Sequence, residues 1–309
     1  RDLHFTIHSF PTRRSSDLVY ATPAAEHRKS LIEDDLASKI TCESCHSSSP
    51  HDNHAKANDH TDKVACQSCH IPRYARVNPT KMYWDWSTAG QKKNGKPYTV
   101  PGKHGKPEYD TKKGSFEWAK NVVPEYFWFN GSIEHLTLED TIDPGRPVKI
   151  NQPAGSREDE NSRIFPFKVH RGKLPYDKVN KKLVIPHLFP KGKEDDTAYW
   201  KTYDWEKAIT AGMEYADLPY SGEFGFVETS YVYPTTHMVA PKENVVACSE
   251  CHTRTGSRIA NLAGFYMPAR DRSAVVDVLG WMLIFGSLLG VALHGLGRLF
   301  TRGNGRKGD

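Results

Sequence analysis

The sequence predicts a mainly α-helical protein with long, irregular, aromatic-rich loops, a small β-hairpin and one C-terminal transmembrane helix. Three observations lead to this expectation. Only 38% of the 309 residues are hydrophobic while Gly and Pro number 23 and 20, so aliphatic side chains are too few to fill a core of this size. All cysteines fall in short repeats of one pattern. A long apolar run lies near the end of an otherwise polar chain.

The six cysteines form three pairs with the same spacing, and each pair is followed directly by histidine. The pairs are Cys42 and Cys45 with His46, Cys66 and Cys69 with His70, and Cys248 and Cys251 with His252. C-x-x-C-H is the attachment pattern of c-type haem. One helical turn brings two thiols to one porphyrin edge and places the histidine beneath the ring as an axial iron ligand. The sequence therefore predicts three covalently bound haems c and a multihaem cytochrome c fold.

A zinc site is the alternative for the first two pairs, because the 20 residues between Cys45 and Cys66 fit a four-cysteine zinc site. That interpretation leaves Cys248 and Cys251 without partners and makes the histidine after every pair a coincidence. Haem is thus the expected cofactor. The net charge of +5 is spread along the chain without a basic block, so no nucleic-acid partner is expected.

Residues 1–18 are expected to be foreign to the protein. The run HSFPTRRSSDL at 8–18 resembles a translated sequencing adapter, and the sequence has neither an initiator Met nor a signal peptide, although haem attachment needs export. We therefore expect an N-terminally truncated periplasmic multihaem domain over residues 19–272, a transmembrane anchor over 273–300 and a cytoplasmic tail over 301–309.

Between the second and third pairs, residues 71–236 are rich in aromatic side chains, Pro and Gly. These aromatic residues could cover porphyrin faces or form the core of an irregular domain. Apolar runs at 164–169 and 183–185 flank a turn and predict a hairpin. Residues 202–216 predict a helix, with apolar or small residues at helical spacing behind a Thr or Asp cap. Pro241 is expected to begin the helix that carries the third pair.

The C-terminal region predicts a membrane anchor. Its 19 residues from Val278 to Leu296 include only Ser287 and His294 as polar side chains, and as a helix they span about 28 Å. Four basic residues follow, at positions 298, 302, 306 and 307, so the positive-inside rule places this end in the cytoplasm. His294 could ligate a b-type haem shared with a partner, or hydrogen-bond a neighbouring helix.

The second axial ligand of each iron decides what a haem can do, because a second histidine closes the iron to substrate. Histidine is the expected distal ligand, and the best-placed candidates are His51, His60 and His237. His54 and His27 come next; each could instead be solvated or serve a haem outside this sequence. His104, His135, His170 and His187 lie among loop residues and are left unassigned.

Five strings give the chain a family resemblance: VACQSCHIPRYAR at 64–76, KMYWDWSTAG at 81–90, NVVPEYFWFNG at 121–131, PFKVHRGKLPYD at 166–177 and GMEYADLPYSGEFGFVET at 212–229. From about Glu26 to Arg270 the chain resembles the C-terminal part of the octahaem tetrathionate reductase family. The resemblance implies that Cys42, Cys66 and Cys248 attach the sixth, seventh and eighth haems. It also implies that the active-site haem, which has a lysine ligand, belongs to the absent N-terminal half; Lys81 is the local lysine to examine.

The resemblance implies a function without choosing a substrate, since the family is associated with reduction of tetrathionate, nitrite and hydroxylamine. We expect the electron-transfer portion of such a reductase, and the alternative is a pure electron relay without a catalytic haem of its own. The anchor departs from soluble members of the family. It therefore suggests the lipid bilayer, a quinol-oxidising or b-type cytochrome partner and the missing N-terminal haem domain as partners.

Overall fold

The computed structural model describes residues 42–304, which divide into two compact units, one up to Ala247 and one from Cys248. The first unit is built on a nine-stranded mixed sheet in the order β2-β3-β4-β1-β9-β11-β7, with β5 and β10 also paired with β9. Its strands are β1 (Thr80–Asp85), β2 (Thr99–Pro101), β3 (Pro107–Asp110), β4 (Gly114–Ala119), β5 (Glu125–Phe129), β7 (Val148–Lys149), β9 (Arg163–Asp177), β10 (Lys182–Leu183) and β11 (Phe224–Pro234). Two further strands, β6 (Ile133–His135) and β8 (Asn151–Pro153), pair separately.

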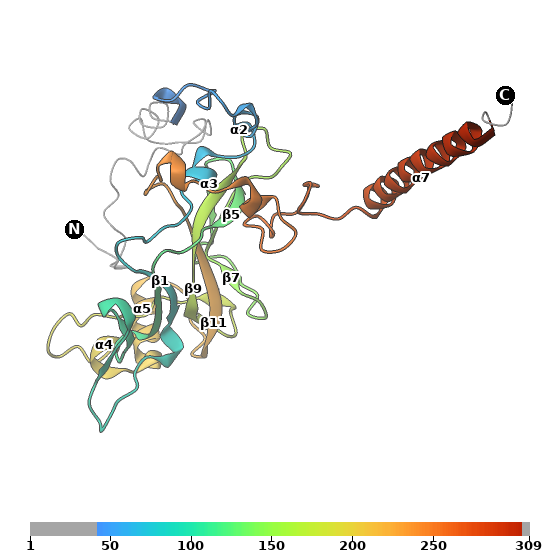
Figure 1. The fold of residues 1–309 in the computed structure, drawn as a ribbon. Coiled ribbons are helices and arrows are strands. Elements are labelled where there is room, and N and C mark those ends of the chain that lie inside the picture. The colour runs from blue at the N-terminus through green and yellow to red at the C-terminus, as the bar shows by residue number, and fades with distance from the viewer. Residues whose placement is uncertain (1–41, 305–309) are drawn as a thin grey trace. The chain divides into compact units, whose positions relative to one another are not determined.

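The prediction of a mainly α-helical fold is therefore wrong. The two long strands β9 and β11 pair antiparallel from Phe224 opposite Asp177 to Pro234 opposite Phe167. Figure 1 shows them running from α3 (Cys66–His70) at one end of the unit to α5 (Trp205–Tyr215) at the other. Aromatic and β-branched side chains favour strands, and the aromatic segments assigned to loops supply β1 and β5.

The sheet is held by aromatic packing at the end that carries the second cysteine pair. Phe165, Phe167 and Val169 of β9 form a buried cluster with Phe129 of β5 and with Ala65, the residue before Cys66. Phe129 meets both Phe165 and Phe167 edge-on, with ring centroids 5.4 and 5.2 Å apart. Such contacts stabilise a core beyond simple area burial. The start of α3 is thus fixed to the sheet.

Two local predictions are confirmed in this unit. The hairpin exists, with Lys182 of β10 opposite Asp177 of β9, although β9 is far longer than expected. The helix at 202–216 is α5, whose Asp204 cap accepts a hydrogen bond from the Lys207 backbone N–H at 3.1 Å. A short helix, α4 (Tyr199–Thr202), precedes it.

The helix expected to run from Pro241 through the third pair is not continuous. The structure has a short 3-10 helix, η6 (Lys242–Asn244), then an extended Val245, and a separate turn, α6 (Cys248–Cys251). The interruption has a physical cause. Val246 donates its backbone N–H to the Cys69 carbonyl of α3 at 2.9 Å. This N–H is therefore not available for the hydrogen bond that a continuous helix from Pro241 would need.

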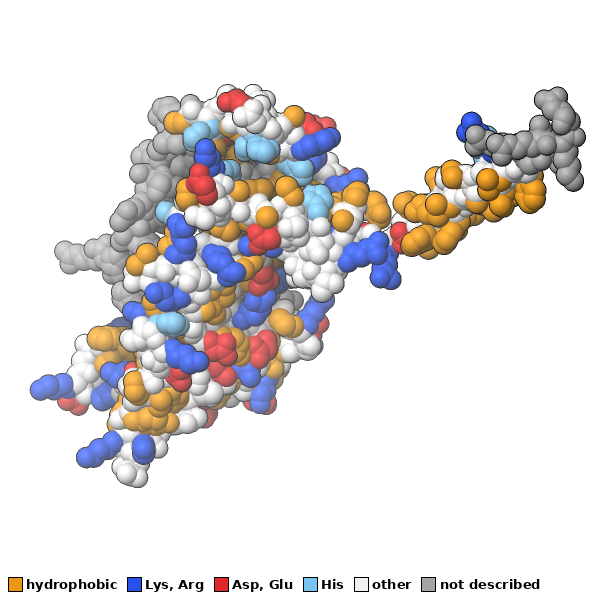
Figure 2. Space-filling model, viewed as in Figure 1, with side chains coloured by type: hydrophobic (Ala, Val, Ile, Leu, Met, Phe, Trp, Pro, Cys, Tyr) orange, Lys and Arg blue, Asp and Glu red, His pale blue; other side chains and the backbone are white. Residues whose placement is uncertain are grey.

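The second unit ends in one long helix, α7 (Ala274–Asn304). An 18-residue window within residues 274–300 has a mean hydropathy of 2.0, and α7 is the one helix among the described residues that is long and apolar enough to cross a membrane. Hydrophobic side chains cover most of the helix surface that is seen in Figure 2. An all-round apolar surface is typical of membrane helices. Within the described residues, length and composition thus agree with the predicted anchor.

Candidate haem-attachment sites

Each cysteine pair folds into one helical turn, which is the geometry that c-type haem attachment requires. In the first pair, which begins the 3-10 helix η3 (Cys42–Ser44), the His46 backbone N–H bonds to the Cys42 carbonyl at 2.8 Å. The third pair repeats this bond from His252 to Cys248, also at 2.8 Å. The second pair is the helix α3 itself. A thiol, a second thiol and an imidazole therefore lie within a single turn at all three places.

The second pair is the most firmly held, because α3 is bonded to the first residues of β9. Ala65 N–H donates to the Ile164 carbonyl at 3.0 Å, and the Ser68 hydroxyl donates to the same oxygen at 2.7 Å. Tyr126 of β5 adds a bond from its hydroxyl to the Ser68 carbonyl at 3.4 Å. The long strand therefore places Cys66 and His70.

The other end of α3 is closed by the chain that precedes the third pair. A helix end leaves carbonyl groups without partners inside the helix. Here the His70 carbonyl accepts from Ala240 N–H at 2.7 Å, and the Cys69 carbonyl accepts from Val246 N–H at 2.9 Å. Residues far apart in sequence thereby fix the backbone of the predicted iron ligand His70.

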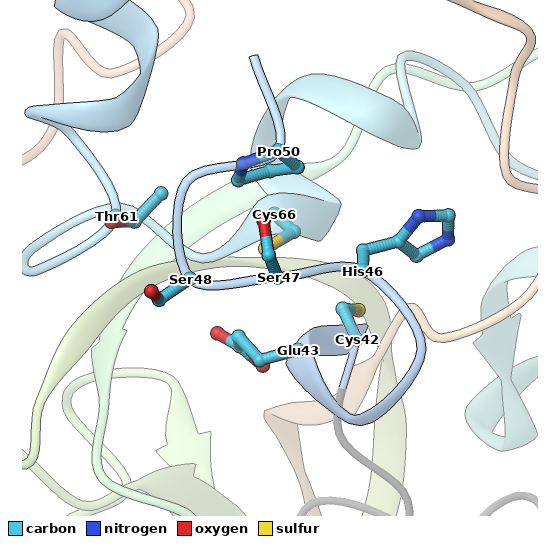
Figure 3. A pocket seen from close by; sticks show the side chains of 8 residues that line it. All are labelled: Cys42, Glu43, His46, Ser47, Ser48, Pro50, Thr61 and Cys66. Carbon is cyan, nitrogen blue, oxygen red and sulfur yellow. The ribbon is translucent and has the colours of Figure 1, made fainter. Parts of the chain in front are cut away.

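The first and second pairs lie side by side. Cys42 and Cys66 line one small pocket together with His46, and Figure 3 shows both sulfur atoms there. Their thiols hydrogen-bond, which lowers the pKa of Cys42 to about 7 and raises that of Cys66. Gln67 Nε2 also donates to Cys42 Sγ at 3.6 Å. Two haems attached here would have adjacent edges.

The most informative geometry joins His51 and His70, whose ring centroids lie 6.2 Å apart with planes inclined by 19°. Two metal–imidazole bonds of about 2 Å on opposite sides of one iron separate ring centroids by about 6 Å. The centroid spacing therefore matches that of two histidine ligands of one iron. Burial, and then the neighbouring His51 and His46, lower the pKa of His70. A lowered pKa favours the neutral imidazole that binds metals.

Asn58, in α2 (Ala55–Asn58), orients His51 and was not found by sequence reasoning. Its Oδ1 accepts from the His51 backbone N–H at 3.1 Å and from His51 Nδ1 at 2.8 Å, while its Nδ2 donates to the His51 carbonyl at 3.2 Å. Because Oδ1 only accepts, Nδ1 carries the proton and Nε2 is the nitrogen that would bind a metal. Partners of this kind orient ligating histidines. No motif marks this asparagine in a single sequence.

The other predicted distal ligands are placed less directly. His60 Nδ1 bonds to the Lys56 carbonyl, so a metal on His60 would bind through Nε2. His237 bonds to Thr236 Oγ1 at 3.0 Å in the exposed segment between β11 and η6. The structure does not assign His60 or His237 to a particular haem iron, so both assignments stay predictions. Figure 2 shows histidine side chains gathered at the end of the first unit that carries α2 and α3.

Of the remaining histidines, two have clear partners in the fold. His187 Nε2 bonds to Asp195 Oδ2 at 2.8 Å and closes the loop before α4. His170 Nδ1 bonds to the Lys81 carbonyl at 3.2 Å, inside the sheet. His54 is exposed and begins α2 without a side-chain cap. His27 lies outside the described residues.

Comparison with known proteins decides the family. Residues 81–255 match the family model described as "Cytochrome c bacterial". The chain belongs to this family. The crystal structure of octaheme cytochrome c from Shewanella oneidensis matches with 41% sequence identity and a TM-score of 0.65, over 71% of this chain and 49% of that chain. No curated protein matches significantly.

This bacterial cytochrome c is thus a member of the octahaem cytochrome family and spans about half the length of the octahaem chain it matches. Family membership identifies the cofactor as covalently bound haem c, and the C-x-x-C-H turns fit it. Within residues 42–304 no group of three or more His, Cys, Asp and Glu side chains is arranged to hold a metal ion.

Proposed function

We propose that this cytochrome is the electron-transfer portion of a membrane-anchored, periplasmic reductase of the octahaem type. Its three C-x-x-C-H turns would attach three haems c, with His46, His70 and His252 as proximal ligands. The observation that carries the proposal is the pairing of His51 with His70 at 6.2 Å. An iron held by histidine on both sides is closed to substrate and transfers electrons.

The residues of the chain have distinct parts in this function. Bound haem supplies one-electron exchange between ferric and ferrous iron. His70 and His51 would bind one haem iron, Asn58 would fix the orientation of His51, and the neighbouring Cys42 and Cys66 would keep two attachment points together. Adjacent haem edges favour rapid electron exchange between the first two haems. Reduction of tetrathionate, nitrite or hydroxylamine would then take place in the absent half of the protein.

The membrane helix supports a link to the quinol pool. Helix α7 is long enough to span a bilayer, and Arg298 follows its apolar core. With the C-terminus in the cytoplasm, the haem domain would be periplasmic, where c-type haem is attached. A quinol-oxidising or b-type cytochrome partner in the same membrane would supply electrons, and His294 is the intramembrane residue suited to contact it.

The test compares two neighbouring histidines in the haem-loaded protein. His51→Ala removes the proposed distal ligand, so one haem becomes five-coordinate and gives a high-spin ferric signal by electron paramagnetic resonance. His54→Ala is the matched control, because His54 is exposed in the same segment and should leave all haems low-spin. A low-spin spectrum in both variants would exclude His51 as a ligand and remove the basis of the proposal.

A further inference from the structure

A second cluster of titratable groups lies on the sheet, outside the haem-attachment turns. Strand β1 has a bulge between Lys81 and Tyr83 where it pairs with β4. A bulge turns a side chain toward the face that it would otherwise avoid. Here it places Lys81 on the same face as Trp84, with Lys81 Nζ 3.4 Å from the Trp84 ring and 4.4 Å from the ring of Phe116.

Strands β9 and β11 bring further groups to Lys81. Lys168 and His170 are two apart on β9, so they share one face, and they lie opposite Tyr233 and Tyr231 of β11. His170 Nδ1 donates to the Lys81 carbonyl at 3.2 Å, and Lys168 Nζ donates to the adjacent Thr80 hydroxyl at 2.6 Å. Three basic groups from two strands therefore lie on one face of the sheet, all of them half-buried.

No carboxylate among residues 42–304 neutralises this cluster. In the described part of the chain, neither Lys81, Lys168 nor His170 forms a salt bridge, and no Asp or Glu contributes to their pKa shifts. Asp85 and Glu228 point elsewhere: Lys173 on the opposite face of β9 bridges them at 4.0 and 3.3 Å. These two acids thus lie on the face of the sheet opposite the three basic groups.

Burial makes the charged forms of these three groups less favourable, and repulsion from neighbouring lysines adds to this effect for Lys81 and His170. Burial, and then Lys113 and Lys168, lower the pKa of Lys81 to about 7. Burial lowers that of Lys168 to about 8 and that of His170 to about 4. An ammonium group has three N–H donors, and Lys168 uses one on Thr80. Buried cations are normally paired, so the cluster is incomplete without an anion.

We propose that Lys81, Lys168 and His170 form an anion site on this face of the sheet, with the hydroxyl groups of Tyr231 and Tyr233 beside it. The ligand is a small oxyanion or carboxylate with at least two acceptor oxygens, which the two ammonium groups bind by charge-assisted hydrogen bonds. The proposal does not depend on the axial ligands described above. The same chemistry has two sources, a free inorganic oxyanion or a propionate of a bound haem.

The experiment uses sodium sulfate as a redox-inert probe, titrated by calorimetry into the protein loaded with all of its haems. Lys81→Met and Lys168→Met keep the aliphatic stems and remove the charges, and each should weaken sulfate binding about tenfold or more. Lys149→Met is the matched control, because this exposed lysine is on β7 of the same sheet and away from the site. Lys168→Arg should retain most of the affinity, which separates loss of charge from misfolding.

The midpoint potentials of the haems distinguish the two sources. If a propionate occupies the site, sulfate does not bind the wild-type protein, and both Met variants lower the potential of one haem while Lys149→Met does not. If the anion is free, sulfate binds and the Met variants weaken it. Sulfate binding that survives both Met substitutions would overturn the proposal, as would absent binding together with unchanged potentials in every variant.

Discussion

At the scale of single residues, a haem ligand depends on partners that a motif does not name. His51 is held by three hydrogen bonds with Asn58, two of them to its backbone. The ring bond leaves Nε2 as the nitrogen that would bind iron in the proposed site, and it raises the basicity of Nε2. Asn58 therefore determines both the position and the ligand strength of His51.

Asn58→Ala tests this role. Without the tether, the His51 ring can leave the iron, so carbon monoxide should bind the reduced haem about tenfold faster than in the wild-type protein. Stopped-flow spectroscopy measures that rate. Asn53→Ala, in the same exposed segment, is the control and should bind carbon monoxide as the wild type does. An unchanged rate in Asn58→Ala would mean that the asparagine only stabilises the loop.

The three C-x-x-C-H turns were predictable because the motif confines two thiols and an imidazole to one helical turn. The approach of His51 to His70 was not, because the sheet helps to place His70. Ala65 and Ser68 bond to Ile164, about a hundred residues further along the chain. The two rings lie 6.2 Å apart only in the folded protein, and the sequence could do no more than offer several histidines as candidate distal ligands.

His170 makes stability depend on pH. Burial, opposed by its bond to the Lys81 carbonyl and helped by the charges of Lys168 and Lys81, lowers its pKa to about 4, against about 6.5 in an unfolded chain. Between these values the unfolded state binds more protons than the folded state, so stability is complete above about pH 6.5 and falls toward pH 4. The thermal unfolding midpoint of the wild type should fall as the pH decreases from about 6.5 to about 4. The midpoint of His170→Asn should fall less steeply over the same pH range. Equal slopes would show that His170 is not buried in the neutral form.

At the scale of elements, helix α5 was predictable and the long strands were not. Helix α5 has a local cap in Asp204 and buried residues at helical spacing. Strand β9 contains Pro166, Gly172 and Pro175, which read as loop residues in a sequence. Yet a Cβ on Gly172 would meet the Trp84 carbonyl, so glycine permits the close approach of β1. The Pro166 carbonyl accepts a hydrogen bond from the backbone N–H of Thr235, the residue after β11, at 2.9 Å.

Helix α5 makes a similar close approach through Gly212. A Cβ at this position would meet the Ile185 carbonyl, and the neighbouring His187 N–H bonds to the Ala208 carbonyl at 2.7 Å. Gly212→Ala should therefore destabilise the fold by about 1–3 kcal/mol, although alanine favours helices. Gly192→Ala is the control, because nothing lies within 4 Å of its Cβ, and its effect should stay within about 0.5 kcal/mol. Chemical denaturation followed by circular dichroism measures both.

At the scale of the whole molecule, a sheet-based haem domain and a long apolar helix belong to one chain. The domain needs no membrane for its hydrogen bonds, whereas α7 exposes large apolar side chains such as Trp281 and Phe285 all along its length. An exposed apolar surface of that extent is typical of a membrane span or of a surface that a partner covers. The proposed haem chemistry and the proposed membrane attachment therefore belong to different parts of the chain.

Removal of residues 274–309 tests this separation. The 27-residue candidate span of α7 is about 40 Å long as a helix, more than a bilayer core of about 30 Å, so its loss should release the protein from the membrane fraction. Haem content and low-spin spectra should be retained, because His51, Asn58 and His70 are unaffected. Reduction by quinol should be lost while reduction by dithionite persists.

Replacement of α7 by an unrelated apolar helix should restore membrane attachment. Recovery of quinol-driven reduction in that chimera would show that α7 only anchors. If quinol-driven reduction stays lost, residues of α7 such as His294 contact the electron donor. Membrane retention of the truncated protein after a high-salt wash would contradict the assignment of α7 as the anchor.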